Sequence, residues 1–323
     1  MNSKSIKPTV LITESLEPIC ADWLSERALT LWCPHDSPDL NAYLSRSDGL
    51  VVRTYTQIHA EMLTRAPHLK VVARAGVGLE NIDLNACRRR KVTVVYTPDA
   101  NTQAVAEYVL GLILDAMRPR TDLPPDATAQ QFHELRRSEI GTQLDQHTLG
   151  IVGFGRIGKR LGSMGHAIGM KLLVCDLLPE APLRQAVDYP FGYVDHATLY
   201  AQSHVVSLHV DGRPANHRML NAQMLKYLRD DCLLLNAARG MLVDPMLLAR
   251  WAQDHPRARV ILDVHDPEPP PINHPLRRLQ NARLLPHLAS RTGIAMKNMG
   301  WVVKDLIGVL NGRPPTHPAP TCL

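Results

Sequence analysis

Short apolar runs alternate with helix-period patterns along the first hundred residues. Strands are predicted near residues 9–13, 28–32, 49–54, 69–74 and 92–96, and helices near 17–25, 38–45, 59–65 and 83–89. The runs carry few polar positions, as in parallel strands that are buried on both faces. The pattern therefore predicts a small parallel sheet with helices on both sides.

A nearly all-apolar helical pattern follows over residues 103–117. It predicts a buried helix that connects the first domain to a second one. The polar, proline-bearing segment 118–141 is interpreted as a loop. Further strands are predicted near 149–152, 171–176, 191–194, 205–210, 232–237, 260–264 and 283–285, which makes a sheet of about seven strands.

A last helical pattern, over residues 292–310, is long enough to return to the first domain. We therefore expect a discontinuous domain of residues 1–100 and 289–323, with a second domain of residues 101–288 inserted in it. The predicted fold class is α/β, with two doubly wound parallel-sheet domains.

A glycine-rich turn stands between the first strand and the first helix of the second domain. Gly153, Gly155 and Gly158 form a GxGxxG pattern. In such a unit the first glycine makes a tight turn, the second lets the backbone approach a pyrophosphate, and the third lets helix and strand pack closely. Asp176 ends the next strand, about where an acid meets the adenosine ribose hydroxyls, and an acid there repels a 2′-phosphate. The pattern predicts binding of NAD rather than NADP.

Composition and charge exclude several classes of function. The net charge of +5 is spread along the chain, which could help attract anionic substrates but does not indicate nucleic acid binding. The densest basic run, residues 88–91, fits the end of a short helix, where cations suit the helix dipole. No apolar run approaches membrane-spanning length, and the N-terminus lacks a signal-peptide pattern.

The cysteines and histidines give no sign of a metal centre. Six cysteines, at positions 20, 33, 87, 175, 232 and 322, form no CxxC pair, and we expect buried reduced thiols in a cytoplasmic protein. The 15 histidines show neither an HExxH motif nor a zinc-ligand spacing, so no metal is expected.

Three loops follow predicted strands of the second domain, at the edge where open α/β sheets bind ligands. They contain Arg239, Glu268 and His287. Singly, each residue is more often structural or solvated than functional. Together, beside a dinucleotide site, they indicate catalysis.

Hydride transfer to a carbonyl carbon explains why these residue types would be needed. The carbonyl oxygen must receive a proton, and histidine is the usual proton donor near neutral pH. A carboxylate beside an imidazole favours its charged form and orients the ring. A guanidinium can hold a carboxylate or polarise a carbonyl with paired hydrogen bonds.

The chain resembles the D-isomer-specific 2-hydroxyacid dehydrogenases over nearly its whole length. The resemblance rests on motifs at residues 74–83, 96–98, 101–107, 153–158, 206–210, 236–244, 263–269 and 286–287. It implies a Rossmann NAD-binding domain inserted in a flavodoxin-like substrate domain, and a homodimer whose long connector helices lie at or near the interface.

The resemblance also implies roles for individual residues. Arg239 would bind the 2-oxo acid, His287 would be the acid/base, and Glu268 would pair with His287. The backbone amides of Val77 and Gly78 would hold the substrate carboxylate. The remaining cofactor contacts implied are Arg156, Ile157, His209, Val210, Asn216, Ala237, Ala238 and Asp263.

Within the family, the motifs lie nearest to the phosphoglycerate dehydrogenase-like branch. Arg53 and Arg74 match the pattern of that branch and would suit a substrate with a second anionic group, although both could simply be solvated at strand ends. Asn101 is the remaining candidate for substrate binding.

The sequence therefore predicts an NAD-dependent enzyme that interconverts a D-2-hydroxy acid and its 2-oxo acid, of the hydroxypyruvate/glyoxylate or 3-phosphoglycerate type. Glu268 argues against formate dehydrogenases, whereas phosphite oxidation by a similar triad stays open. The alternative of another class is a non-catalytic, NAD(H)-responsive interaction protein, like the transcriptional corepressors built on this fold.

Overall fold

The computed structural model describes residues 7–118 and 120–320. The chain divides into two compact units, the first of Met1–Asn101 with Ser290–Leu323 and the second of Thr102–Ala289. The chain therefore passes between the units twice, after Asn101 and after Ala289.

The first unit is built on a five-stranded parallel sheet of order β2-β1-β3-β4-β5. This is the flavodoxin-like order, as predicted. Its elements are β1 (Thr9–Ile12), α1 (Pro18–Ser25), β2 (Leu29–Trp32), α2 (Leu40–Leu44), β3 (Gly49–Val52), α3 (Ala60–Thr64), β4 (Val71–Arg74), α4 (Leu84–Arg89), β5 (Thr93–Tyr96), α12 (Gly293–Gly300) and α13 (Val302–Leu310).

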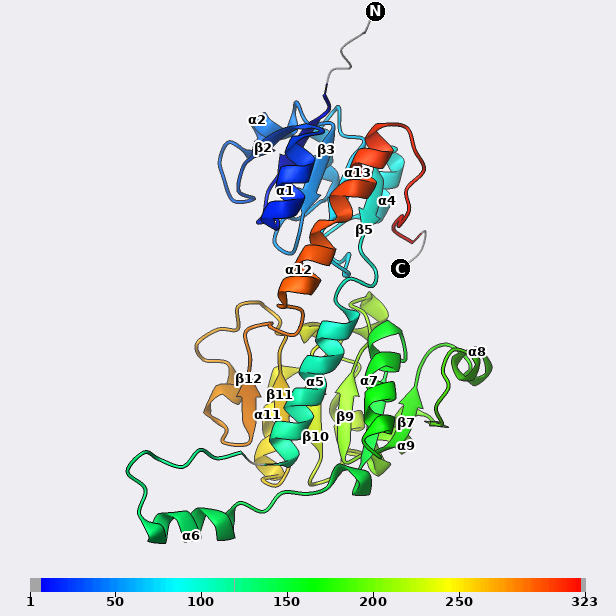
Figure 1. Cartoon of the computed structure of the whole chain (residues 1–323). Helices are drawn as coiled ribbons and strands as arrows, with labels where there is room; N and C mark the ends of the chain where they lie inside the picture. Colours follow the sequence, from blue (N-terminus) through cyan, green and yellow to red (C-terminus); the bar gives the residue numbers. More distant parts are fainter. Residues whose placement is uncertain (1–6, 119, 321–323) are drawn as a thin grey trace, which may run out of the picture. The chain divides into compact units, whose positions relative to one another are not determined.

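Helices cover both faces of this sheet (Figure 1). Successive residues of β1 point to opposite faces. Val10 and Ile12 belong to the core beneath α1 and α13, whereas Leu11 belongs to the core beneath α2, α3 and α4. Because both faces of the central strands are buried, those strands carry mostly apolar residues, which is the pattern that the sequence shows.

The second unit contains a seven-stranded parallel sheet of order β12-β11-β10-β9-β6-β7-β8. The order reverses between β6 and β9, as in doubly wound dinucleotide-binding folds. Its elements are α5 (Thr102–Met117), α6 (Ala129–Ser138), β6 (Thr148–Val152), α7 (Arg156–Ala167), β7 (Lys171–Cys175), α8 (Glu180–Gln185), β8 (Gly192–Tyr193), α9 (His196–Gln202), β9 (Val205–Leu208), α10 (Ala222–Leu225), β10 (Leu233–Asn236), α11 (Pro245–Asp254), β11 (Arg259–Leu262) and β12 (Ala282–Leu284), with short 3₁₀ turns at 144–146, 214–216, 240–242 and 275–278.

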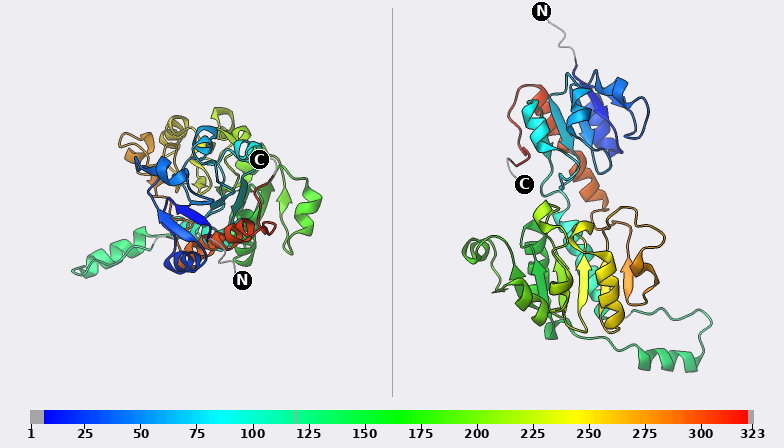
Figure 2. Two further views of the ribbon diagram at one scale, coloured as in Figure 1. Left: turned by 90° about the horizontal axis from the view of Figure 1, so that it is seen from above. Right: turned by 180° about the vertical axis from the view of Figure 1, so that it is seen from behind.

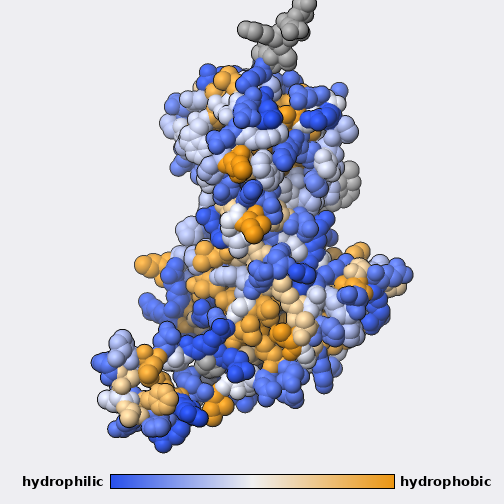
Figure 3. Space-filling view, in the orientation of Figure 1, coloured by the Kyte–Doolittle hydropathy of each residue, from blue (hydrophilic) through white to orange (hydrophobic). Residues whose placement is uncertain are grey.

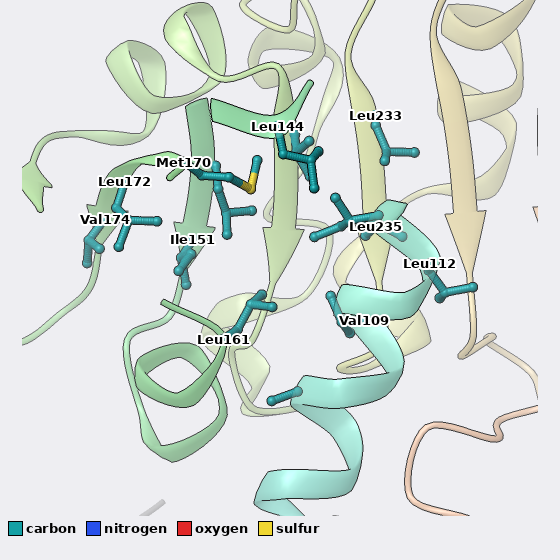
Figure 4. Close-up of a cluster of buried hydrophobic side chains, with 14 of the residues drawn as sticks. Val109, Leu112, Leu144, Ile151, Leu161, Met170, Leu172, Val174, Leu233 and Leu235 are labelled. Carbon is teal, nitrogen blue, oxygen red and sulfur yellow. The ribbon is translucent and has the colours of Figure 1, made fainter. Parts of the chain in front are cut away.

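Helices α5 and α7 lie against one face of this sheet, and α11 lies on the reverse (Figures 1 and 2). The buried face of α5 explains its apolar sequence. Val109 and Leu112 lie in the same core as Leu233 and Leu235 of β10 (Figure 4). The predicted connector helix is therefore a core helix of the second unit.

Three features of the structure differ from the sequence prediction. The segment 118–141, expected to be a loop, contains α6, whose start is fixed by a capping box between Thr128 and Gln131. The predicted single helix over 292–310 is broken at Trp301 into α12 and α13. The helices α8 to α11 were not predicted individually.

Five cysteines are free and buried, as expected, while Cys322 lies outside the described residues. In the described part of the chain, no helix is long and apolar enough to cross a membrane. The same residues contain no group of three His, Cys, Asp or Glu side chains that could hold a metal ion.

Candidate active site

The glycine-rich turn between β6 and α7 has the geometry that its sequence predicts. Gly153 has φ +91°, and a Cβ there would lie 2.7 Å from the backbone oxygen of His209. A Cβ at Gly158 would lie 2.2 Å from the oxygen of Gly153, so only glycine allows this helix to pack so closely. A Cβ at Gly155, by contrast, would meet no atom within 4 Å. The turn is therefore open to a ligand at Gly155 and closed at the other two glycines.

A cavity of about 690 Å³ adjoins this turn. The predicted cofactor residues that line it are Gly153, Gly155, Arg156, Asp176, His209, Val210 and Asn216. Ile157, Gly158, Ala237, Ala238 and Asp263 do not line it. The cavity lies wholly within the second unit.

Asp176 lies at the carboxyl end of β7 and borders the cavity. Its carboxylate accepts hydrogen bonds from the amides of Phe154 and Leu178. These bonds fix the side chain beside the glycine-rich turn. Each carboxylate oxygen can still accept a further bond, as a ribose hydroxyl would require.

The opposite wall of the cavity is formed by the segment after β9. Burial lowers the pKa of His209 to about 4, so its ring is neutral at neutral pH, and its Nε2 lies 2.8 Å from Oγ of Ser207. Asn216 donates from Nδ2 to the backbone oxygen of Asp211 at 3.0 Å. The carboxylate of Asp211 also accepts from Nε of Arg213 at 2.7 Å, which lowers the pKa of Asp211.

These features fit a dinucleotide. The first turn of α7 begins at Gly155 without a side-chain cap, so its amides face the cavity end of the helix, where negative charge is favoured. Arg156 and Lys159 add positive charge to the lining. The pyrophosphate of such a ligand would be held by the amides of Arg156 and Ile157, and its ribose by Asp176.

Glu268 and His287 form a hydrogen-bonded pair at the carboxyl edge of the same sheet. Oε2 of Glu268 lies 2.9 Å from Nδ1 of His287. His287 has φ +55°, a left-handed conformation that few residues other than glycine adopt. Burial alone would raise the pKa of Glu268, but hydrogen bonds from His287 and from the amide of His265 lower it. Glu268 is therefore a charged partner that orients the imidazole.

Arg239 follows β10, the strand next to β11 and so to the loop that carries Glu268. Its Nη1 donates to the oxygen of Ala238 at 2.6 Å. The adjoining Gly240 packs directly on that loop, because a Cβ there would lie 2.0 Å from the carbonyl carbon of His265. The arginine loop and the glutamate loop are thus in contact through Gly240.

Asp263 is fully buried, and its carboxylate supports a neighbouring segment of the chain. Its carboxylate accepts bonds from the amides of Leu288 and Ala289, both at 2.9 Å, and from the Tyr108 hydroxyl at 3.4 Å. It therefore fixes the segment directly after His287. Ala237 packs against the core, and Ala238 donates its amide to Oδ1 of Asn236.

In the first unit, Arg53 follows β3 at the carboxyl edge of the sheet. Its guanidinium donates to the oxygen of Ser15 at 3.2 Å and contacts the sulfur of Met296 at 3.2 Å. Burial lowers the pKa of Arg53, with Arg291 adding to the effect. The structure thus holds Arg53 within its own unit.

The loop after β4 carries the other predicted substrate residues. The Arg74 guanidinium lies over Gly76, whose φ of +154° is a backbone conformation that other residues rarely adopt. Val77 and Gly78 follow in a half-buried loop. Among the described residues their amides donate to no other protein group. Asn101 is the last residue before the chain enters α5.

Sequence reasoning missed three residues that shape these loops: Glu14, Tyr108 and His265. The carboxylate of Glu14 is buried and accepts bonds from the amides of residues 53–56 and from the Thr56 hydroxyl. Tyr108 contacts Asp263, and burial raises the pKa of Tyr108 to about 12. Since the partners of Glu14 and Tyr108 are distant in sequence, no local pattern signals these contacts.

Comparison with known proteins agrees with this geometry. The family model for the NAD binding domain of D-isomer specific 2-hydroxyacid dehydrogenases matches residues 110–289. A D-3-phosphoglycerate dehydrogenase of Archaeoglobus fulgidus is 30% identical, over 94% of this chain and 58% of its own length. A hydroxypyruvate reductase of Thermotoga maritima is also 30% identical, over 82% of this chain and 85% of its own.

A crystal structure of a Thermus thermophilus protein shares the fold with a TM-score of 0.83 and 32% identity, covering 97% of this chain and 100% of that chain. The fold and the glycine-rich cavity define a two-unit, dinucleotide-binding α/β protein. The chain belongs to the D-isomer specific 2-hydroxyacid dehydrogenase family. It spans little more than half the length of the phosphoglycerate dehydrogenases that it matches.

Proposed function

We propose that this protein is an NAD-dependent oxidoreductase that interconverts a D-2-hydroxy acid and its 2-oxo acid. The observation that carries the proposal is the Glu268–His287 pair, joined at 2.9 Å on the sheet that also carries the glycine-rich turn and its cavity. An acid/base pair beside a nicotinamide site is what carbonyl reduction requires.

The chain's own residues supply binding and proton transfer. When bound, NADH supplies the hydride for carbon C2 of the oxo acid. The protonated His287 ring donates its Nε2 proton to the C2 oxygen, while Glu268 holds the ring through Nδ1 and stabilises its charged form. Arg239 holds the carboxylate and the carbonyl oxygen of the substrate with paired hydrogen bonds. In oxidation, the neutral ring accepts the hydroxyl proton.

The proposed substrates are small 2-oxo acids of the hydroxypyruvate/glyoxylate or 3-phosphoglycerate type. The names of the relatives in Archaeoglobus fulgidus and Thermotoga maritima support this class. We assign the amides of Val77 and Gly78 to the substrate carboxylate, and Arg53, Arg74 and Asn101 to the remainder of the substrate. A second anionic group on the substrate would explain two arginines at the edge of the first sheet.

Two mutants test the proposed acid/base. Replacing His287 with Ala should lower turnover with NADH and the preferred oxo acid about 10²- to 10⁴-fold, the usual contribution of a general acid/base. His68→Ala, at an exposed histidine of the first unit, should leave turnover unchanged. The assay measures NADH consumption with hydroxypyruvate, glyoxylate, pyruvate, 2-oxoglutarate and phosphohydroxypyruvate. Near-normal turnover of His287→Ala would contradict the assignment of His287 as the acid/base.

The same assay distinguishes the proposed enzyme from the alternative, a non-catalytic, NAD(H)-responsive interaction protein. The two relatives named above are a dehydrogenase and a reductase, which gives the corepressor alternative no support. NADH binding without turnover on any oxo acid of the panel would contradict the proposed activity.

We also propose that the protein forms a homodimer through the second unit. Apolar side chains gather on the face that carries α5 and α6 (Figure 3). Leu110 and Leu114 of α5 are only half-buried, and Phe132 of α6 and Ile140 are exposed. Burying these side chains against a second copy would remove them from water. Light scattering after gel filtration should give twice the chain's mass, and Phe132→Glu should lower the measured mass toward that of one chain.

A further inference from the structure

His265 has no part in the chemistry described above, yet it lies directly behind the proposed acid/base pair. It is 9% exposed and follows β11, three residues before Glu268. A buried histidine in such a place calls for an explanation, because a buried ring nitrogen without a hydrogen bond costs free energy.

The backbone of His265 holds the glutamate of the pair. Its amide donates to Oε1 of Glu268 at 2.9 Å, while Oε2 of the same carboxylate lies 2.9 Å from Nδ1 of His287. The carboxylate therefore bridges the His265 backbone and the catalytic ring. A carboxylate held at both oxygens has little freedom to rotate away.

The ring of His265 holds the segment that carries the histidine of the pair. Its Nε2 lies 2.8 Å from the backbone oxygen of Leu285, two residues before His287. Because a carbonyl oxygen can only accept, this nitrogen must carry a proton. Leu285 is thereby fixed from both sides, since its own amide donates to the oxygen of Leu262.

These contacts form a closed circuit that starts and ends at one residue. It runs from the His265 amide through Glu268 to His287, back along the chain to Leu285, and through the Leu285 oxygen to the His265 ring. With Nε2 protonated, the neutral ring has a bare Nδ1, and that atom is buried with no hydrogen-bond partner in the described residues.

A neighbouring buried histidine does not share these contacts. The nearest aromatic neighbour is His274, whose ring centre lies 6.1 Å away and whose Nδ1 accepts from the amide of Leu276. His274 makes no hydrogen bond to Glu268 or His287 among the described residues. The His265 ring therefore connects this buried region to the loop of the acid/base at Leu285, as the Asp263 carboxylate does at Leu288 and Ala289.

We infer that His265 is a positioning residue: through its ring bond to Leu285 and its backbone bond to Glu268, it holds the two loops of the acid/base pair in register. The inference rests on the proposed function of Glu268 and His287. A displacement of about 1 Å at an acid/base can cost up to about 10² in rate, so the bond has a measurable consequence.

Three variants test this role. His265→Phe keeps an aromatic ring and removes the donor; His265→Gln keeps an N–H at a similar reach. His274→Asn is the matched control, a neighbouring buried histidine whose replacement keeps an acceptor for the Leu276 amide. We expect His265→Phe to lower kcat about tenfold or more and to change the pH profile of kcat. His265→Gln should recover activity to within about threefold of wild type, and NADH affinity, measured by fluorescence titration, should be unchanged throughout.

A spectroscopic measurement makes the test independent of turnover. In ligand-free protein, NMR of the histidine ring protons should show a protected Nδ1–H signal for His287, bonded to Glu268. This signal should be lost in His265→Phe and kept in His265→Gln and His274→Asn, even if no oxo acid is turned over and the proposed function fails. A wild-type signal and pH profile in His265→Phe, or equal losses in His265→Phe and His265→Gln, would overturn the inference.

Discussion

Each unit carries a buried carboxylate at the carboxyl edge of its parallel sheet, but the two edges differ in what surrounds that group. In the first unit, Glu14 accepts the amides of residues 53–56 and fixes the loop that bears Arg53. In the second unit, Asp263 accepts the amides of Leu288 and Ala289 and fixes the segment after His287.

The two sheet edges differ in the groups that lie around the buried carboxylate. The edge of the second unit adds an ionisable pair and a histidine backbone in left-handed conformation, and the same sheet carries the cavity bordered by the glycine-rich turn. Arg53, at the edge of the first unit, is instead bonded to groups of its own unit. This contrast supports our proposal that the second unit carries the chemistry and the first unit selects the substrate.

The largest effect short of removing the acid/base should come from Arg239. Arg239→Ala removes charged hydrogen bonds to the substrate, each worth about 1.5–3 kcal/mol. We expect kcat/KM for the oxo acid to fall about 10²-fold, while NADH affinity is kept. Arg229→Ala, which removes an ion pair of the same unit with Asp231, is the control and should change little. A loss below threefold in Arg239→Ala would place substrate binding elsewhere.

A smaller effect is expected where the arginine loop meets the glutamate loop. Gly240→Ala places a Cβ 2.0 Å from the His265 backbone, so the loops must separate. Overpacking of this kind costs about 1–3 kcal/mol, and kcat should fall about tenfold. Gly111→Ala on α5 is the control, because a Cβ there meets nothing within 4 Å. Equal thermal stability and activity in both variants would show that the contact is not needed.

In the first unit, the expected effect is on stability alone. Burial raises the pKa of Glu14, but its bonds to the Thr56 and Tyr55 amides outweigh this and lower it from 4.5. A carboxyl with a lowered pKa stabilises the fold above pH 4.5, and this contribution is lost as the pH falls through the folded-state pKa. Glu14→Gln should therefore cost about 2 kcal/mol at pH 7 and flatten the decline in acid.

Tryptophan fluorescence can follow this change, because Trp23, Trp32 and Trp301 lie in the first unit and only Trp251 lies in the second. Glu26→Gln is the control, since Glu26 forms an exposed ion pair with Arg27. If wild type and Glu14→Gln lose stability in parallel between pH 5 and pH 3, Glu14 does not hold the 53–56 loop as described.

The sheets of this protein could be predicted from sequence because buried parallel strands leave continuous apolar runs. The glycine-rich turn could also be predicted, since only glycine fits at positions 153 and 158. Helix α6 could not, because it has no buried residues and its signal is the capping box at Thr128 rather than an apolar stripe.

In the candidate site too, some residues could be predicted from the sequence and others could not. Arg239, Glu268 and His287 have side chains that suit the chemistry and follow strand ends, so the sequence points to them. Glu14 and the His265 ring bond to backbone groups 20 or more residues away, and Leu285 takes part through its backbone alone. Contacts of that kind leave no trace in residue type or spacing.

The pH dependence of oxo acid reduction by wild type and Glu268→Gln tests the central claim most directly. The pKa of Glu268 is lowered, so its carboxylate is charged across the neutral range and favours the protonated form of the ring beside it. Reduction needs that proton, so kcat should fall as the pH rises. Glu268→Gln removes the charge beside the ring, so we expect a pH profile that differs from that of wild type and a lower maximal rate, with NADH affinity unchanged. Superimposable pH profiles for the two proteins would contradict the assignment of Glu268 and His287 as the catalytic pair.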